Sequence, residues 1–175
     1  MSELFPLVLR TARTLLVFHS VHMRPYTQSD VESLIGVYTA AIHSLAAPYY
    51  TPEQLDAWAP PNQDAGKWRE RLASVQTLVA EHDGIIAGFA SYKLDGHLFL
   101  LFTHPNFARQ GVATRLCRRV ESALRATGVT RIFTEASLAG QPFFEHCGFE
   151  LGLEELVECR GVRLRRFHMH KQISL

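Results

Sequence analysis

The stretch LFLLFTHPNFARQGVATRLCRRVESALRA, from Leu98 to Ala126, decides the fold of this chain. Its first five residues are apolar and predict a strand, which His104 and Pro105 bring to an end. A short loop follows, and a helix is predicted from Gln110 onward. The first N–H groups of a helix have no acceptor within the helix. A strand, a loop and a helix in this order therefore predict a backbone site for an anion such as phosphate or pyrophosphate.

Composition restricts the class of protein. The chain has 175 residues, 47% of them hydrophobic and 20% charged, which is typical of one globular domain. A formal net charge of +1 argues against a general nucleic-acid-binding protein. The three cysteines, Cys117, Cys147 and Cys159, are scattered, so we expect neither a disulfide framework nor a zinc site, and a cytoplasmic location is the simplest. The sequence contains no run of about 18 apolar residues, so it predicts no membrane-spanning helix.

Residues 1–20 differ in character from the rest of the chain. The apolar run Leu15–Phe18 follows two arginines and is faintly similar to a secretory signal peptide. The run is short, His19 and His22 interrupt it, and no small-residue cleavage site follows. We therefore expect an N-terminal extension over residues 1–20 and a single domain over residues 21–175.

Hydrophobic periodicity and turn residues predict the order of elements in this domain. Strands are expected over residues 17–24, 76–82, 85–93, 97–103 and 130–136, with two more on either side of Arg160–Gly161. Helical segments are expected over residues 31–45, from 51 to 59, and over residues 64–73, 110–127 and 140–147. This order predicts an α+β fold, with a mixed, mostly antiparallel central sheet of about seven strands flanked by about four helices.

Two segments and the order of elements carry a resemblance to a known family. The loop 108–113, ARQGVA, resembles the R/Q-x-x-G-x-G/A pyrophosphate loop of the GNAT superfamily of acetyl-CoA-dependent N-acyltransferases. Glu135–Ser137 followed by Pro142–Phe149 is similar to the family's strand-then-helix segment that ends in F-Y-E-x-x-G-F. The resemblance covers about residues 23–175. A narrower resemblance, to the YafP-like branch of bacterial GNATs, is carried by Arg24–Tyr26, Tyr50–Pro60 and Pro142–Phe144.

The resemblance implies an N-acetyltransferase that moves an acetyl group from acetyl-CoA to an amine by direct attack in a ternary complex. It implies acetyl-CoA as the cosubstrate, no metal, and a small-molecule or peptide acceptor. It implies neither a nucleic-acid nor a membrane partner, and it is compatible with a homodimer. The implied cofactor-binding residues are Leu101, Phe102, Thr103, Arg109, Gln110, Gly111, Val112, Ala113, Thr114, Ser137 and Phe144. The segment that lines the acceptor site in this family contains Tyr49, Tyr50 and Trp58, for which packing of a helix pair is the alternative role.

The chain departs from the family pattern at two positions. Ala108 stands where the loop usually has arginine or glutamine, although backbone N–H groups can hold a pyrophosphate without that side chain. Phe144 stands where many members have a tyrosine that protonates the leaving thiolate. Ser137, a tyrosine from elsewhere or water could replace that acid, or none is needed because a thiolate leaves readily. The departures motivate an alternative, a catalytically impaired acyl-CoA-binding module.

The base that deprotonates the amine is open at this stage. Glu135 is the first candidate, as a base or as a substrate anchor, and its alternative is a solvated carboxylate at a strand end. His97 is the second, and its alternative is a residue that ends a turn. His43 and Glu81 are weaker candidates. We do not expect a covalent mechanism at Cys147, because no base adjoins it in the pattern.

Basic residues gather near the C-terminus, namely Arg160, Arg163, Arg165, Arg166 and Lys171. They could form an RNA-binding surface. However, the strand before them carries Glu150, Glu154, Glu155 and Glu158. A hairpin that turns at Arg160–Gly161 places the two sets opposite each other, so we expect cross-strand ion pairs instead.

Overall fold

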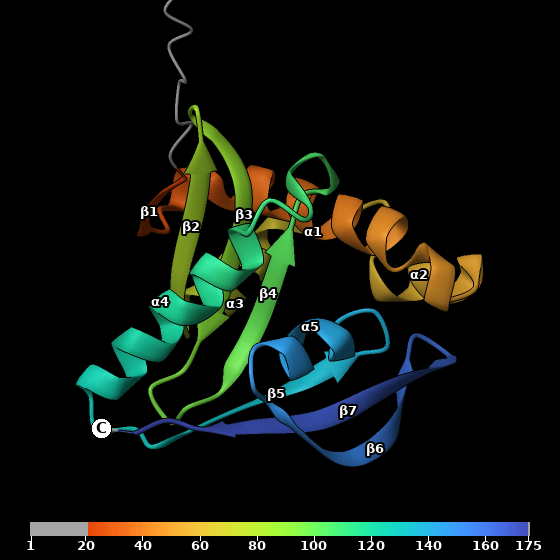
Figure 1. Ribbon diagram of the computed structural model, residues 1–175. Coiled ribbons are helices and arrows are strands. Elements are labelled where there is room, and N and C mark those ends of the chain that lie inside the picture. Colours follow the sequence, from red (N-terminus) through yellow and green to blue (C-terminus); the bar gives the residue numbers. More distant parts are fainter. Residues whose placement is uncertain (1–20, 175) are drawn as a thin grey trace, which may run out of the picture.

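The computed structural model of the protein describes residues 21–174 (Figure 1). Its strands are β1 (His22–Pro25), β2 (Gln76–His82), β3 (Ile85–Tyr92), β4 (Leu98–Thr103), β5 (Arg131–Ser137), β6 (Glu150–Cys159) and β7 (Val162–Gln172). Its α-helices are α1 (Val31–Leu45), α2 (Pro52–Trp58), α3 (Ala65–Ala73), α4 (Val112–Ala126) and α5 (Gln141–His146). The extension predicted over residues 1–20, and the first part of the strand predicted over residues 17–24, lie outside the described residues.

The strands form two antiparallel sheets. One has the order β1-β2-β3-β4 and the other the order β5-β7-β6. A parallel bridge between His97 and Phe133 joins them where β4 and β5 begin. The predicted α+β class and the predominance of antiparallel pairing are therefore confirmed, and the single sheet that we expected is divided into two.

A bulge in β4 accompanies this division. Ser91 pairs with Leu100 and Tyr92 pairs with Leu98, which leaves Phe99 without a partner on β3. An extra residue of this kind bends and twists its strand. In Figure 1, β4 rises steeply whereas β5 runs almost horizontally, so their C-terminal ends, at Thr103 and Ser137, diverge.

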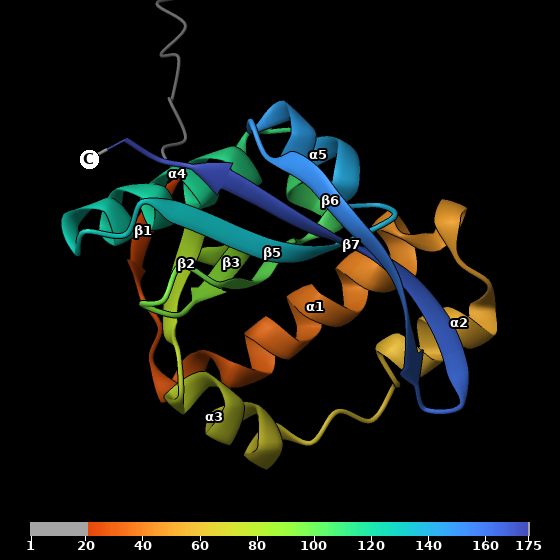
Figure 2. The same ribbon diagram turned by 90° about the horizontal axis from the view of Figure 1, so that it is seen from below.

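Helices cover both faces of the first sheet. Figure 1 shows α4 in front of it, and Figure 2 shows α1 and α3 on the opposite side. Val112, Leu116, Val120 and Leu124 of α4 recur every four residues and are at most 1% exposed. They belong to one core cluster, whereas α1, α2 and α3 contribute to a second around Phe89. The two clusters fix α1 and α4 against opposite faces of the strands that carry the site.

An ion-pair cluster holds β1 to its neighbours. Arg24 on β1 lies 2.7 Å from Oδ2 of Asp30 and 2.7 Å from Oε1 of Glu81 on β2. The hydrogen bond from Arg24 lowers the pKa of Asp30 to about 2, and bonds from Thr27 add to this effect. Asp30 therefore binds as a carboxylate over the whole neutral range.

The C-terminal hairpin of β6 and β7 forms some of the ion pairs expected from the sequence. Arg165 lies 3.2 Å from Glu154, and Arg166 lies 2.8 Å from Glu155. Lys171 instead binds Glu121 of α4 at 2.8 Å. These arginines are thus partnered by β6 rather than arranged as a free basic surface.

Candidate active site

The loop between β4 and α4 has the backbone of an anion site. Arg109 and Gly111 have positive φ angles of 63° and 80°. Gly111 is the N-cap of α4, so the helix begins at Val112, two residues later than the sequence predicted. A residue in this left-handed conformation cannot belong to a right-handed helix, so the helix starts after Gly111, and glycine adopts the conformation without a steric penalty.

The first turn of α4 leaves its donors unpaired within the helix. The first helical bond runs from the N–H of Arg115 to the carbonyl of Gly111 at 3.0 Å. The N–H groups of Val112, Ala113 and Thr114 precede it, and no side chain caps them. These donors and the helix dipole favour a negatively charged group in front of the turn.

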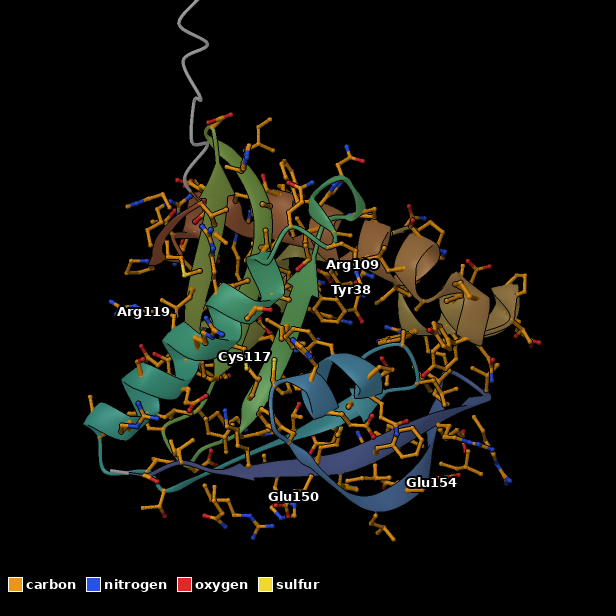
Figure 3. All side chains as sticks on the ribbon, viewed as in Figure 1. Tyr38, Arg109, Cys117, Arg119, Glu150 and Glu154 are labelled. Atoms are coloured by element: carbon orange, nitrogen blue, oxygen red, sulfur yellow. The ribbon has the colours of Figure 1, made fainter. Side chains whose placement is uncertain are left out.

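A cavity of about 750 Å³ opens in front of this turn. It extends from the start of α4, where Figure 3 labels Arg109, to the C-terminal end of α1 and to Trp58 of α2. Its volume lies in the range of small-molecule and cofactor sites. Twelve residues predicted from the sequence line it: Tyr49, Trp58, Leu101, Phe102, Thr103, Arg109, Gly111, Val112, Ala113, Thr114, Ser137 and Phe144.

The polar atoms of the cavity fit a cofactor that carries phosphate and amide groups. The hydroxyl of Thr103 is buried and has no hydrogen-bond partner among the described residues. Such a group costs free energy unless a ligand or water satisfies it. Together with the N–H groups of α4, it gives a bound cofactor partners on both β4 and the loop, as acetyl-CoA would require.

Ser137 and Phe144 lie next to each other in the cavity wall. A side chain built on Gly140 would lie 3.3 Å from Oγ of Ser137 and 3.7 Å from the ring of Phe144. The N–H of Gly140 donates to Oγ of Ser137 at 3.1 Å. Burial raises the pKa of Tyr50, and a side-chain hydrogen bond between Ser137 and Tyr50 acts to lower it. Phe144 packs edge-on against Phe143 and Phe149 and has no proton to give.

Tyr50 and Gln110 do not line the cavity, although the sequence placed both in the site. Tyr50 is 8% exposed, and its hydroxyl accepts from the N–H of Leu138 and donates to the carbonyl of Arg165. It therefore supports the wall by joining distant segments. The side chain of Gln110 turns back to donate to the carbonyl of Asn106 at 2.9 Å.

The two predicted catalytic residues lie together, outside the cavity lining. Nε2 of His97 is 2.7 Å from Oε2 of Glu135, and Nδ1 of His168 is 3.9 Å from Oε1 of the same carboxylate. The hydrogen bond with His97 lowers the pKa of Glu135, and the charges of Arg166 and His168 act in the same direction. Glu135 is thus an ionised carboxylate with His97 as its partner.

The weaker candidates have structural partners. His43 lies 2.7 Å from the carbonyl of Ala59, and Glu81 binds Arg24. Cys147 is next to Cys117, and a hydrogen bond from that thiol lowers the pKa of Cys147 to about 7. Neither cysteine lines the cavity.

Sequence reasoning missed one wall of the cavity. Ala41, Ile42, Leu45 and Ala46, at the end of α1, line it, although the sequence predicted no more than a helix over residues 31–45. His146 also lines it, as the last residue of α5. Phe107, Ala139 and Gly140 also line it, as do Ala108, Pro142 and Phe143, which belong to the two segments that carry the family resemblance.

Clusters of metal ligands and membrane-spanning helices are both absent from residues 21–174. These residues contain no group of three or more histidine, cysteine, aspartate or glutamate side chains that could hold a metal ion. No helix within them has both the length and the hydropathy needed to cross a membrane.

Comparison with known families decides the identity of the fold. A family model described as an acetyltransferase (GNAT) domain matches residues 46–172. The chain belongs to the GNAT family of acetyltransferases. This GNAT chain is 30% identical over 151 residues to the uncharacterized N-acetyltransferase YafP of Escherichia coli K12. The aligned region covers 86% of this chain and 95% of YafP. Both the family and its narrower branch, predicted from the sequence, are thereby confirmed.

Solved structures agree with this assignment. The GCN5-related N-acetyltransferase of Rhodopseudomonas palustris superposes with a TM-score of 0.85 and is 30% identical, with 88% of this GNAT chain and 96% of that chain covered. PaiA N-acetyltransferase of Thermoplasma acidophilum, solved in complex with coenzyme A, has a TM-score of 0.72 at 19% identity, with 88% and 99% covered. No comparison supports the alternative of a catalytically impaired module.

Proposed function

We propose that this protein transfers the acetyl group of acetyl-CoA directly to the amine of a small molecule or peptide, within a ternary complex. The observation that carries the proposal is the cavity that connects the open N–H groups of α4 to an aromatic and apolar wall on α1 and α2. A cofactor and an acceptor can therefore enter one continuous space from its two ends.

The cofactor end is the loop at the start of α4. The N–H groups of Gly111, Val112, Ala113 and Thr114 would bind the pyrophosphate, and Arg109 adds a positive charge in the lining. The unpartnered hydroxyl of Thr103 would bind the pantetheine arm between the diverging ends of β4 and β5. Acetyl-CoA supplies the activated thioester, and the chain supplies these contacts.

The acceptor end lies under Tyr49 and Trp58. An amine must lose a proton to attack a thioester carbonyl. Because no aspartate or glutamate is among the described residues that line the cavity, we propose that the proton leaves through water to Glu135, with His97 holding that carboxylate. Backbone N–H groups near Leu101–Thr103 would stabilise the oxyanion.

The leaving thiolate requires little help. An ordinary thiol has a pKa of about 8.5, so its anion is a tolerable leaving group at neutral pH. Ser137 brings a hydroxyl near Phe144, where the family has its tyrosine, since a Cβ added to Gly140 would meet both side chains. We propose that Ser137, rather than Phe144, gives this proton.

The test combines binding and turnover. Acetyl-CoA should raise the melting temperature of the full chain, and an acceptor amine should raise the rate of thiol release above the rate of hydrolysis. Stabilisation without any amine-dependent thiol release would favour the impaired module instead. Absence of stabilisation at millimolar acetyl-CoA would overturn both assignments. The cytoplasmic location and the homodimer expected from the sequence stay predictions.

A further inference from the structure

The acceptor end of the cavity has an apolar wall. It is lined by Ala41, Ile42 and Leu45 of α1, by Ala46 directly after that helix, and by Tyr49 and Trp58. Leu45 is 39% exposed and Tyr49 is 49% exposed, so both lie at a rim that an incoming molecule can cover. When a ligand covers exposed apolar side chains and removes them from water, the free energy of binding becomes more favourable.

Charge is almost absent from the lining. Of the described residues that line the cavity, Arg109 alone is an arginine, lysine, aspartate or glutamate, and it lies at the start of α4. Glu53 and Asp56 of α2 are exposed and do not line the cavity. Glu135 also lies outside the lining, and its carboxylate is already bound to His97.

This distribution discriminates between kinds of amine. An acceptor with two or more ammonium groups would have to place the second one against the α1 wall, where no carboxylate compensates the loss of its hydration. An acceptor with a hydrocarbon or aromatic body has no second charge to remove from water there, and it would bury apolar surface favourably.

We infer that the acceptor is an apolar monoamine, and that the wall formed by α1, Tyr49 and Trp58 excludes polyamines and other polycationic amines. The inference rests on the proposed acetyl transfer and names the substrate class of that same cavity.

The test uses two acceptors that differ at one end. Hexylamine and 1,6-diaminohexane have the same carbon chain, but in the second an ammonium replaces a hydrogen of the terminal methyl group. We expect kcat/KM for hexylamine to exceed that for the diamine by at least about 30-fold. Phenethylamine, which tests an aromatic body, should also exceed the diamine.

A matched pair of variants tests whether the wall causes this preference. Leu45→Glu places a carboxylate at the rim of the cavity and should reduce the ratio of kcat/KM between the two amines at least about tenfold, by improving the diamine. Ile85→Glu makes the same change at a residue that is 60% exposed on β3 and is absent from the lining, and it should leave the ratio unchanged.

The possible outcomes separate the inference from the function beneath it. If no amine raises thiol release in the wild-type chain, the proposed transfer itself fails. If the diamine or spermidine is acetylated as efficiently as hexylamine, the transfer stands and the inference is wrong. The wild-type comparison decides between these outcomes even if Leu45→Glu does not fold.

Discussion

Nε2 of His97 lies 2.7 Å from Oε2 of Glu135, although 38 residues separate the two in sequence. His97 stands just before β4 and Glu135 lies on β5, close to the point where the bridge between His97 and Phe133 joins the two sheets. The ring of His97 stacks on Phe133 at 4.8 Å, which fixes its orientation. The pair is therefore held by the same contact that connects the sheets below the diverging strand ends.

The first prediction concerns the carboxylate of this pair. Glu135→Gln removes the proposed proton acceptor without changing the size of the side chain. We expect kcat/KM for the acceptor amine to fall about 100-fold, a typical contribution of general base catalysis. The Kd for acetyl-CoA should stay the same, since Glu135 does not line the cavity. Steady-state kinetics and calorimetry measure the two quantities.

The second prediction concerns the pH profile. The hydrogen bond from His97 lowers the pKa of Glu135, so His97→Ala should raise it toward its ordinary value. The acidic limb of kcat/KM should then move to higher pH. His170→Ala is the control, because His170 is on β7 and faces Glu150 at 3.6 Å instead. A limb that disappears in His146→Gln but persists in Glu135→Gln would assign the base to His146.

A third prediction concerns the missing tyrosine. Ser137→Ala should lower kcat about tenfold, which is modest because the thiolate leaves readily without an acid. Phe144→Tyr places a phenol beside Ser137 and should restore most of this loss in the double variant. No effect of Ser137→Ala on kcat, with chemistry as the slow step, would show that water alone protonates the thiolate.

The fourth prediction concerns the loop at α4. Gly111 has a φ of 80°, and a Cβ added there would meet no atom within 4 Å, so Gly111→Ala acts through backbone strain alone. The loop should relax, and the Kd for acetyl-CoA should rise about tenfold as its N–H groups turn away. Gly84→Ala is the matched control, with a φ of 77° and equally open space in the turn between β2 and β3. It should lower stability similarly and leave the Kd unchanged.

The fifth prediction concerns stability in acid. Arg24 lowers the pKa of Asp30 from 3.8 to about 2, so the carboxylate contributes stability above pH 4 that is lost as the pH falls through 2. The contribution is about 2 kcal/mol, since the side chain is only 9% exposed. Asp30→Asn should therefore lose stability at pH 6 and show a smaller decline in unfolding free energy between pH 4 and 2. Urea titrations at each pH measure the unfolding free energy, and Asp56→Asn, at an exposed position, is the control.

Local patterns in the sequence predicted the cofactor end of the site. The break at His104–Pro105, the glycine at position 111 and the apolar stripe of α4 are all contained in one short segment, so their geometry follows from neighbouring residues. The family resemblance then gave the cofactor, and the structure places most of the implied residues in one cavity.

Contacts between distant segments could not be predicted in this way. Tyr50 binds the carbonyl of Arg165, 115 residues away, so its burial depends on the hairpin of β6 and β7. The bulge at Phe99 arises from the pairing of β4 with β3, and β4 contains no glycine or proline from which it could be predicted. The α1 wall resembles an ordinary core stripe, because helical spacing cannot distinguish apolar residues that face the core from those that face a cavity.

Initial rates of thiol release, measured while acetyl-CoA and an apolar amine are varied together, test the central claim most directly. Direct attack in a ternary complex predicts double-reciprocal lines that intersect, and no acetylated form of the enzyme in the absence of amine. Parallel lines together with an acetyl group retained on the chain would contradict direct transfer. A rate that no amine raises above hydrolysis would contradict the acetyltransferase assignment of this cavity.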